Sequence, residues 1–537
     1  MLDLSLEPTD ADAKPLFRDA AGCAKWLKQL QLTNLQLAHS QLLTQLNELN
    51  RYPMRPRERL NTLEQVRDTV HHVQNDYSRR LISKPLPLNE HELLVFVAIA
   101  GLWQTMSLGY RRCLQAYVDG DSQLAQSGAL LCQRSLLYGG KVIFEHLCTG
   151  YEFDAKLWQQ LHGLYAFCER KGLQHKEIPD PLNDFRAHST CHGIYIKILL
   201  ACYARPAELN RPQLQRLDHW LTRWSDTLPL ERSYTTSRGD AQPLALDFDG
   251  PYGLRSIQLV NHGENTRYLA MVPLSKLLRI KTILLQQGQT PQQLELGEYS
   301  RNDCIESLIF FHQCWCENRN TRSDQRDPVE KPVQIFYKPE VVHALLSGKS
   351  PAQPAQTDNA SILKSGPPPA QAWPGSTGND QGITGQAFET WMVLNESILG
   401  AQLTRKDMQG SRVGRNQLIA LRFAGTENFI LGVLSWANVT LGGKLRVGVR
   451  YLPGSPLAVA LRASEADLPV AGSRIPAFFL QAVPALTIPP SLVMPREWFD
   501  AGRTIEIMHT NGKTQNAKLG FSVERGMNYQ RVSFTLV

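Results

Sequence analysis

Two short polar motifs contain the residue types best suited to binding a ligand. Arg322 and Arg326 are spaced as RxxxR, shortly before an apolar segment. A guanidinium group is a planar fork that can hold a phosphate, pair with the edge of a guanine or stack on a base. Further along, Asn395, Ser397 and Gly400 are spaced as NxSxxG and open another apolar segment. A glycine beside short polar side chains lets a ligand or a neighbouring backbone approach closely.

Each motif also has a purely structural interpretation. The arginines can form a solvated charge cluster with Asp324 and Asp327, and the NxSxxG can be an ordinary turn into a strand. The sequence contains 57 Lys and Arg residues, so an RxxxR spacing also arises by chance. The motifs therefore carry weight only together with the elements that surround them.

The segments around both motifs alternate with a period of two, which is typical of β-strands. In residues 444–451, KLRVGVRY, the apolar Leu445, Val447 and Val449 alternate with Lys444, Arg446 and Gly448. Residues 333–337, 417–423 and 429–436 are similar apolar segments, and Gly442-Gly443 forms a turn. Asn511-Gly512, between segments 504–509 and 517–523, is typical of a tight hairpin. The chain after residue 391 is therefore predicted to form an antiparallel barrel or a pair of small barrels.

The order of these elements resembles the PilZ domain. That family has an RxxxR at the edge of a small barrel, a (D/N)xSxxG on a strand, and then strands of G-x-V-x-W and G-V-x-F type. The last two correspond to Gly432–Trp436 and Gly448–Tyr451 in this chain. The resemblance covers roughly residues 319–452 and implies a six-stranded antiparallel barrel. The whole layout also resembles the large PilZ-containing receptors of bacterial pilus and motility systems.

The resemblance implies a ligand, the bacterial second messenger cyclic di-GMP. It assigns Arg322 and Arg326 to guanine and phosphate contacts, and it places Asn395, Ser397 and Gly400 on the adjoining strand. Stacking of an arginine on a base contributes roughly 0.5–2 kcal/mol per contact.

A long segment departs from the family pattern. Residues 346–388 are rich in Pro, Gly, Ser, Ala and Gln and are predicted to be a flexible insert within the barrel. Each doubling of loop length costs only about 0.6 kcal/mol in closure entropy, so the barrel can accommodate it. The insert does bear on whether the RxxxR is placed for binding.

The N-terminal half has a helical pattern. Apolar residues recur at helical spacing, with Asn34 or Thr33 as a cap before the first long stripe and Pro56 before the second. Residues 244–248 and 256–260 resemble strands, and 274–285 and 303–316 resemble helices. The sequence thus predicts a multidomain α+β protein. Its parts are a helical domain over 1–230, a mixed α/β region over 231–318, the PilZ-like barrel over 319–455 and a C-terminal β extension over 456–537.

Composition limits the cellular setting. The net charge of +7 is a mild excess that tolerates an anionic ligand without demanding one. The first residues lack a basic region followed by an apolar run, so no signal peptide is expected. The longest apolar stretch, 93–103, is shorter than the roughly 20 residues that a bilayer needs and is interpreted as a buried helix. Ten cysteines without framework spacing indicate reduced thiols and a cytoplasmic protein without a membrane span.

Neither a metal site nor catalysis is expected. The HSTCH at 188–192 and HQCWC at 312–316 lack the two paired ligand clusters of a zinc site. The sequence contains no P-loop, dinucleotide-binding glycine motif or nucleophile elbow. No catalytic residue is predicted, and the chain is interpreted as a binding protein.

Three functions remain open from the sequence. The first is a receptor whose barrel binds cyclic di-GMP and whose helical half relays that state to a protein partner, such as the pilus or motility machinery. The second is a protein-interaction scaffold with a degenerate barrel that no longer binds nucleotide, which the long insert favours. The third is nucleic-acid binding by a basic barrel, and the sequence argues against it because interleaved aromatic and basic strand residues are lacking.

Overall fold

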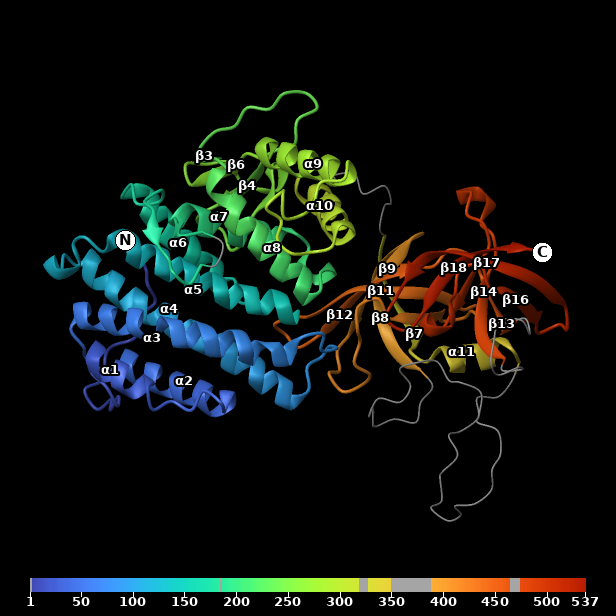
Figure 1. Cartoon of the computed structure of the whole chain (residues 1–537), viewed down its shortest axis with the longest axis horizontal. Helices are drawn as coiled ribbons and strands as arrows, with labels where there is room; N and C mark the ends of the chain where they lie inside the picture. Colours follow the sequence, from blue (N-terminus) through green and yellow to red (C-terminus); the bar gives the residue numbers. More distant parts are fainter. Residues whose placement is uncertain (1, 184–185, 318–326, 349–387, 464–473) are drawn as a thin grey trace, which may run out of the picture. The chain divides into compact units, whose positions relative to one another are not determined.

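The computed structural model describes residues 2–183, 186–317, 327–348, 388–463 and 474–537. The chain divides into two compact units (Figure 1). The first contains the helices and a small sheet. The second contains two β-barrels together with the short segment Pro85–Pro87. The predicted insert falls mainly on 349–387, which lie outside the described residues.

The first unit is built mainly from antiparallel helices whose starts follow the expected signals. Asn34 caps α2, because its Oδ1 accepts a hydrogen bond from the Leu37 amide at 3.1 Å. Pro56 is the first residue of α3. Asn89 and Glu92 form a capping box at the start of α4. The helices are α1 Ala20–Leu27, α2 Leu35–Arg51, α3 Pro56–Ser78, α4 Glu90–Val118, α5 Gly128–Thr149, α6 Lys156–Arg170, α7 Cys191–Tyr203 and α8 Arg211–Trp224.

Helix α4 contains the apolar stretch that was expected to be buried. Among the described residues it alone is long and apolar enough to cross a membrane, and 61% of its most apolar window is buried inside the structure. Ile99, Leu102 and Met106 are fully buried. Helices α3 and α5 pack on it, as expected of a core helix in a helical domain.

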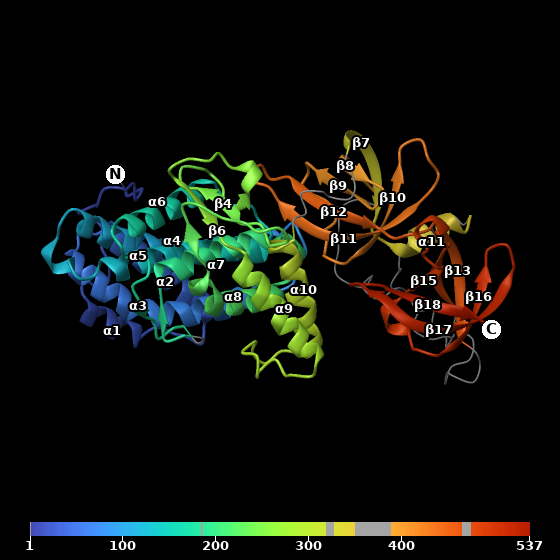
Figure 2. The ribbon, with the colours of Figure 1, turned by 90° about the horizontal axis from the view of Figure 1, so that it is seen from above.

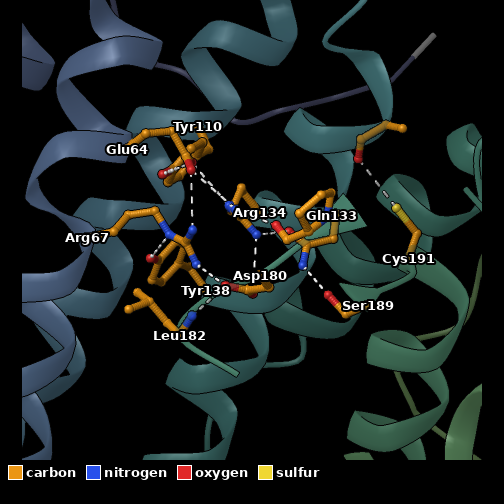
Figure 3. A network of polar contacts seen from close by, with 12 residues as sticks. Glu64, Arg67, Tyr110, Gln133, Arg134, Tyr138, Asp180, Leu182, Ser189 and Cys191 are labelled. Carbon is orange, nitrogen blue, oxygen red and sulfur yellow. Dashed lines mark hydrogen bonds and ion pairs between the residues drawn. The ribbon is translucent and has the colours of Figure 1, made fainter. Parts of the chain in front are cut away.

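A buried charge network joins the helices α3 and α5 (Figure 3). Arg134 of α5 contacts Glu64 at 3.1 Å and Asp180 at 3.2 Å, and Arg67 of α3 contacts Asp180 at 2.8 Å. Burial alone would raise the pKa of both carboxyl groups, but the two arginines outweigh it and hold each pKa below its usual value. The network lies among stacked Tyr110 and Tyr138 rings.

The helical unit ends with a small sheet and two more helices. Strands β3 Leu230–Glu231, β6 Thr266–Leu269, β4 Leu244–Asp247 and β5 Arg255–Ser256 form a four-stranded sheet in that order. Helices α9 Val272–Gln286 and α10 Arg301–Trp315 follow. The prediction of a strand over 256–260 is wrong. Strand β5 ends at Ser256, and Ile257–Leu259 form a 3₁₀ turn.

The first barrel closes in the order β10-β11-β12-β9-β8-β7. Its strands are β7 Asp327–Phe336, β8 Glu389–Ser397, β9 Gly400–Arg405, β10 Leu418–Phe423, β11 Ile430–Val439 and β12 Leu445–Tyr451. The predicted alternation of buried and exposed side chains along β12 is confirmed: Leu445, Val447 and Val449 are buried, while Lys444 and Arg450 are exposed. A six-stranded antiparallel barrel was expected and is confirmed.

The C-terminal strands form a second closed barrel rather than an appendage. It closes in the order β13-β14-β15-β18-β17-β16 around its own apolar core. Its strands are β13 Pro456–Ala463, β14 Ile475–Leu480, β15 Ser491–Met494, β16 Thr504–His509, β17 Thr514–Arg525 and β18 Gln530–Leu536. The expected hairpin joins β16 to β17, with Gly512 at a φ of +83°.

The two barrels share a buried cluster. Leu418 and Ala420 of β10 pack with Phe478 and Leu480 of β14 and with Tyr529. Helix α11 Pro339–Leu346 contacts strands of both barrels (Figure 2), and its His343 Nε2 lies 2.9 Å from the Val459 carbonyl oxygen. Strand β10 is therefore buried on both faces, which explains its unbroken apolar sequence. The multidomain α+β class is confirmed, while the predicted domain boundaries stay predictions.

Candidate functional site

The NxSxxG motif forms the tight hairpin between β8 and β9. Ser397 ends β8, Gly400 begins β9, and the two residues pair across the turn. The Ser397 hydroxyl accepts a hydrogen bond from the Leu399 amide and donates one to the Gly400 carbonyl oxygen, both at 3.3 Å. Serine thus fixes the turn geometry, as short hydroxyl side chains commonly do.

Gly400 lies where two backbones meet. A Cβ atom at this position would lie 2.1 Å from the Val449 carbonyl oxygen on β12. Such a contact is far inside van der Waals distance, so the strand pairing requires glycine here. Of the two reasons for glycine considered from the sequence, close approach of a backbone is the one that the geometry supports.

Two β-bulges turn the polar side chains of this region outward. In β8, Val393 pairs with Leu403 inside the barrel, and the register then shifts so that Asn395 pairs with Gln402. In β11, Leu434 pairs with Val449, and the next paired residue is Trp436, opposite Gly448. Each bulge adds one residue and so moves the following side chain to the other face. Simple alternation would have placed Asn395 and Trp436 inside.

The result is one row of cross-strand neighbours on the outer face. Trp436 of β11, Gly448 of β12, Gln402 of β9 and Asn395 of β8 follow one another across the sheet. The indole lies over Gly448, where a Cβ atom would be 2.1 Å from its Nε1. The Asn395 amide Nδ2 donates to Gln402 Oε1 at 2.7 Å. Gln402 was not predicted as a site residue, because only the strand register brings it to Asn395.

Strand β7 begins beside this row. Arg322 and Arg326 of the RxxxR lie outside the described residues, so that prediction stays untested. The residue after Arg326 in the sequence, Asp327, pairs with Glu396, which lies between Asn395 and Ser397. The first described residue of β7 is therefore a neighbour of the strand that carries the NxSxxG.

The insert leaves the barrel at the opposite end of the same two strands. There Ile335 of β7 pairs with Glu389, the first residue of β8. A nine-residue strand such as β8 spans roughly 26 Å from end to end. Asp327 and Glu389 therefore lie at opposite ends of the β7–β8 pair.

The charges around the row are mixed. Glu396 accepts from Lys331 Nζ at 2.5 Å and from the Tyr451 hydroxyl at 3.0 Å. Burial, reinforced by the neighbouring Glu396 carboxylate, raises the pKa of Tyr451, so the phenol stays protonated. On β12, Arg446 and Arg450 are outward neighbours of Gly448, and Arg450 pairs with Glu524 of the second barrel. The row can thus offer amide donors, an aromatic ring and nearby guanidinium groups to an anionic ligand.

The cysteine- and histidine-rich segments are used in packing. Both ring nitrogens of His192 have partners at 2.8 Å, the Tyr165 hydroxyl and the Leu228 carbonyl. Cys191 lies 3.8 Å from the Ala129 carbonyl oxygen. Within the described ranges no group of three His, Cys, Asp or Glu side chains is placed to hold a metal ion.

Two family models match this chain. Residues 20–235 match the family described as "Cyclic-di-GMP receptor FimW, N-terminal domain", and residues 466–537 match "FimW C-terminal beta-barrel domain". The first range covers most of the helical unit and the second covers most of the second barrel. The row on the first barrel lies between the two matched ranges.

A curated relative carries the name FimW, which both family models also use. The cyclic-di-GMP receptor FimW of Pseudomonas aeruginosa (strain PAO1) is 25% identical over 331 residues, which are 61% of this chain and 53% of the receptor. The chain spans about half the length of that relative. It is thus similar to the receptor FimW through the helical domain at one end and the β-barrel domain at the other.

Proposed function

We propose that this chain is a cytoplasmic receptor for cyclic di-GMP and that the ligand binds at the first barrel, beside the β8–β9 hairpin. The observation that supports the proposal is the pairing of Asp327 with Glu396, because Asp327 directly follows Arg326 in the sequence and lies beside the strand that bears Asn395 and Ser397. The similarity to a receptor named for this ligand supports the choice of ligand.

The chemistry of the row suits this ligand. Cyclic di-GMP has two phosphates and two guanines, which present acceptors and flat π surfaces. In the proposed mode Arg322 and Arg326 contact guanine and phosphate, as the PilZ resemblance implies. Asn395 contributes an amide at the strand surface, while Ser397 and Gly400 shape the hairpin. The proposed role is binding and relay rather than catalysis.

A relay needs a partner. The resemblance to PilZ receptors of pilus and motility systems points to that machinery as the partner, with the helical unit as the part that contacts it. Binding transmits a signal only if the ligand favours one state of the chain over another.

Calorimetric titration of the full chain with cyclic di-GMP tests the proposal. The variant Arg322→Ala/Arg326→Ala is expected to lose binding. The matched control Arg474→Ala/Arg496→Ala, at exposed positions of the second barrel, is expected to bind like the wild type. Absence of binding by the wild type would instead favour the scaffold with a degenerate barrel. Equal binding by the motif variant would show that the site is elsewhere.

A further inference from the structure

The helical unit contains a cavity of about 390 Å³. Side chains of α3, α4, α5, α7 and α8 line it, including Trp103, Tyr138, Lys141, Lys197 and Arg211. A volume of this size is within the range of small-molecule sites, about 300–1,000 Å³. None of the predicted site residues lines the cavity, so it is separate from the row on the first barrel.

Arg211 is a buried cation with unused donors on this cavity. The residue is 6% exposed, and its Nη2 lies 3.3 Å from Glu145 Oε2. Its Nε and Nη1 are buried and have no hydrogen-bond partner among the described residues. Leaving buried charged donors unsatisfied is costly, so the geometry calls for an acceptor from outside the chain.

A second unpartnered donor belongs to Trp103 of α4, which also lines the cavity. Trp103 is 2% exposed, and its Nε1 also lacks a partner within the described part of the chain. An indole N–H can only donate. Among the described residues, every unpartnered buried side-chain atom on this wall belongs to Arg211 or Trp103, and each is a donor. A molecule that paired with these groups would have to supply hydrogen-bond acceptors.

The carboxylates of the wall do not supply these acceptors, because each is engaged by a cation. Glu145 pairs with Arg211, Asp180 with Arg67 and Arg134, Asp218 with Lys197, and Asp226 with Arg186.

Lys141 forms no ion pair among the described residues and adds positive charge beside Lys197. Burial lowers the pKa of Lys197, and Lys141 lowers it further against the opposing effect of Asp218. Lys141 thus leaves the wall with a positive charge that no carboxylate pairs within the described residues, which favours an anion.

Several aromatic side chains also line the cavity. Phe144 and Tyr299 line the cavity together with Trp103 and Tyr138. The volume also exceeds that of a bare inorganic anion. An organic group with a flat face, attached to an anionic group, fits both features.

We propose that this cavity binds a phosphate-bearing molecule of mononucleotide size, with Lys141 and Arg211 at the phosphate and Trp103 donating a further hydrogen bond. The site does not depend on cyclic di-GMP binding at the barrel.

The test is titration of the full chain carrying Arg322→Ala/Arg326→Ala, so that the barrel motif cannot contribute. GMP, AMP, inorganic phosphate and guanosine are the probes. GMP or AMP is expected to bind, and guanosine is not. Lys141→Gln is expected to weaken nucleotide binding at least tenfold, because a partly exposed cation is removed without breaking an ion pair. Lys276→Gln, on the exposed side of α9, is the matched control and is expected to have no effect.

A second variant tests the N–H donor of Trp103 without disturbing the fold of the helical unit. Trp103→Phe keeps an aromatic ring and removes only the N–H, so it should weaken nucleotide binding while thermal unfolding shows a folded helical unit. Failure of both nucleotides to bind at millimolar concentration would overturn the proposal. So would inorganic phosphate binding as tightly as GMP, or Lys141→Gln binding as the control does.

Discussion

At the residue scale, Gly400 tolerates no side chain, because a Cβ atom there would collide with the Val449 carbonyl oxygen at 2.1 Å. Gly400→Ala is expected to lower the free energy of unfolding by roughly 1–3 kcal/mol, since the β9–β12 pair must separate to admit the methyl group. Denaturant unfolding of the full chain measures this. Gly442→Ala is the control in the same barrel, because no atom there lies closer than 3.9 Å. Equal stability of the two variants would contradict the close approach.

Asn395 provides a test of the binding row itself. Asn395→Ala removes the amide group that the proposed site offers to cyclic di-GMP and should weaken binding at least tenfold. The melting temperature should change little, because the position is only half-buried. Asn511→Ala in the β16–β17 turn also removes an amide side chain and should bind normally. If both variants bind alike, Asn395 is not a ligand contact.

Some of this detail could be predicted from residue types, and some could not. The cap at Asn34 follows from a local rule that one sequence reveals, whereas the requirement for glycine at 400 comes from Val449 on a distant strand. The outward direction of Asn395 and Trp436 depends on bulges in β8 and β11. A bulge is a property of a strand pair, so no pattern within one strand indicates it.

At the element scale, the α3–α5 charge network makes the helical unit sensitive to acid. The pKa values of Glu64 and Asp180 are lowered in the folded state. Their contribution is therefore fully present above the unfolded values, about 4.3 and 3.9, and is lost as the pH falls through the lower folded values. The free energy of unfolding should decrease as the pH falls below about 4. Urea unfolding followed by far-ultraviolet circular dichroism measures it.

Asp180→Asn identifies the source of that pH dependence. The variant should be less stable at pH 7, because Arg67 and Arg134 lose a buried partner, and its stability should vary less with pH. The exposed Glu298→Gln is the control and should retain the wild-type pH profile. A wild-type profile in Asp180→Asn would assign the acid sensitivity to other groups.

The main helices and strands could be predicted because each has a clear period. Short elements could not. Helix α11 was missed because it lies between a predicted strand and the low-complexity segment. The strand expected over 256–260 gave way to a 3₁₀ turn because only Arg255 and Ser256 find partners on β4.

At the scale of the whole molecule, the cluster shared by the barrels should make them unfold together. Phe478 of the second barrel is fully buried in that cluster beside residues of the first. Phe478→Ala is expected to cost about 3–5 kcal/mol and to accelerate amide exchange in β10 and β11 as well as in β14. Exchange measured by mass spectrometry checks this. Changes confined to residues 456–537 would show that the barrels are independent.

The proposed relay makes a second prediction at this scale. Addition of cyclic di-GMP to the full chain should alter amide exchange within residues 20–228, because only a state-dependent change can transmit a signal. Arg322→Ala/Arg326→Ala should abolish that change. If the ligand changes protection only within residues 319–452, the chain binds cyclic di-GMP but the helical unit takes no part in a relay.

The sequence indicated two β-rich regions but not how they are coupled. From the sequence, the apolar residues on the outer faces of β10 and β11 indicate only that these strands are buried. No local pattern indicates that a second barrel covers them. Coupling of this kind depends on surfaces far apart in the chain.

Asp327 and Glu389 lie at opposite ends of the β7–β8 pair, and this has a practical consequence. A sequence inserted between α11 and β8 enters the pair at the Glu389 end and leaves the pairing of Asp327 with Glu396 in place. We therefore expect this stretch to accept a fluorescent protein, which would report the position of the chain in a living cell without occupying the end of β8 that carries Asn395 and Ser397.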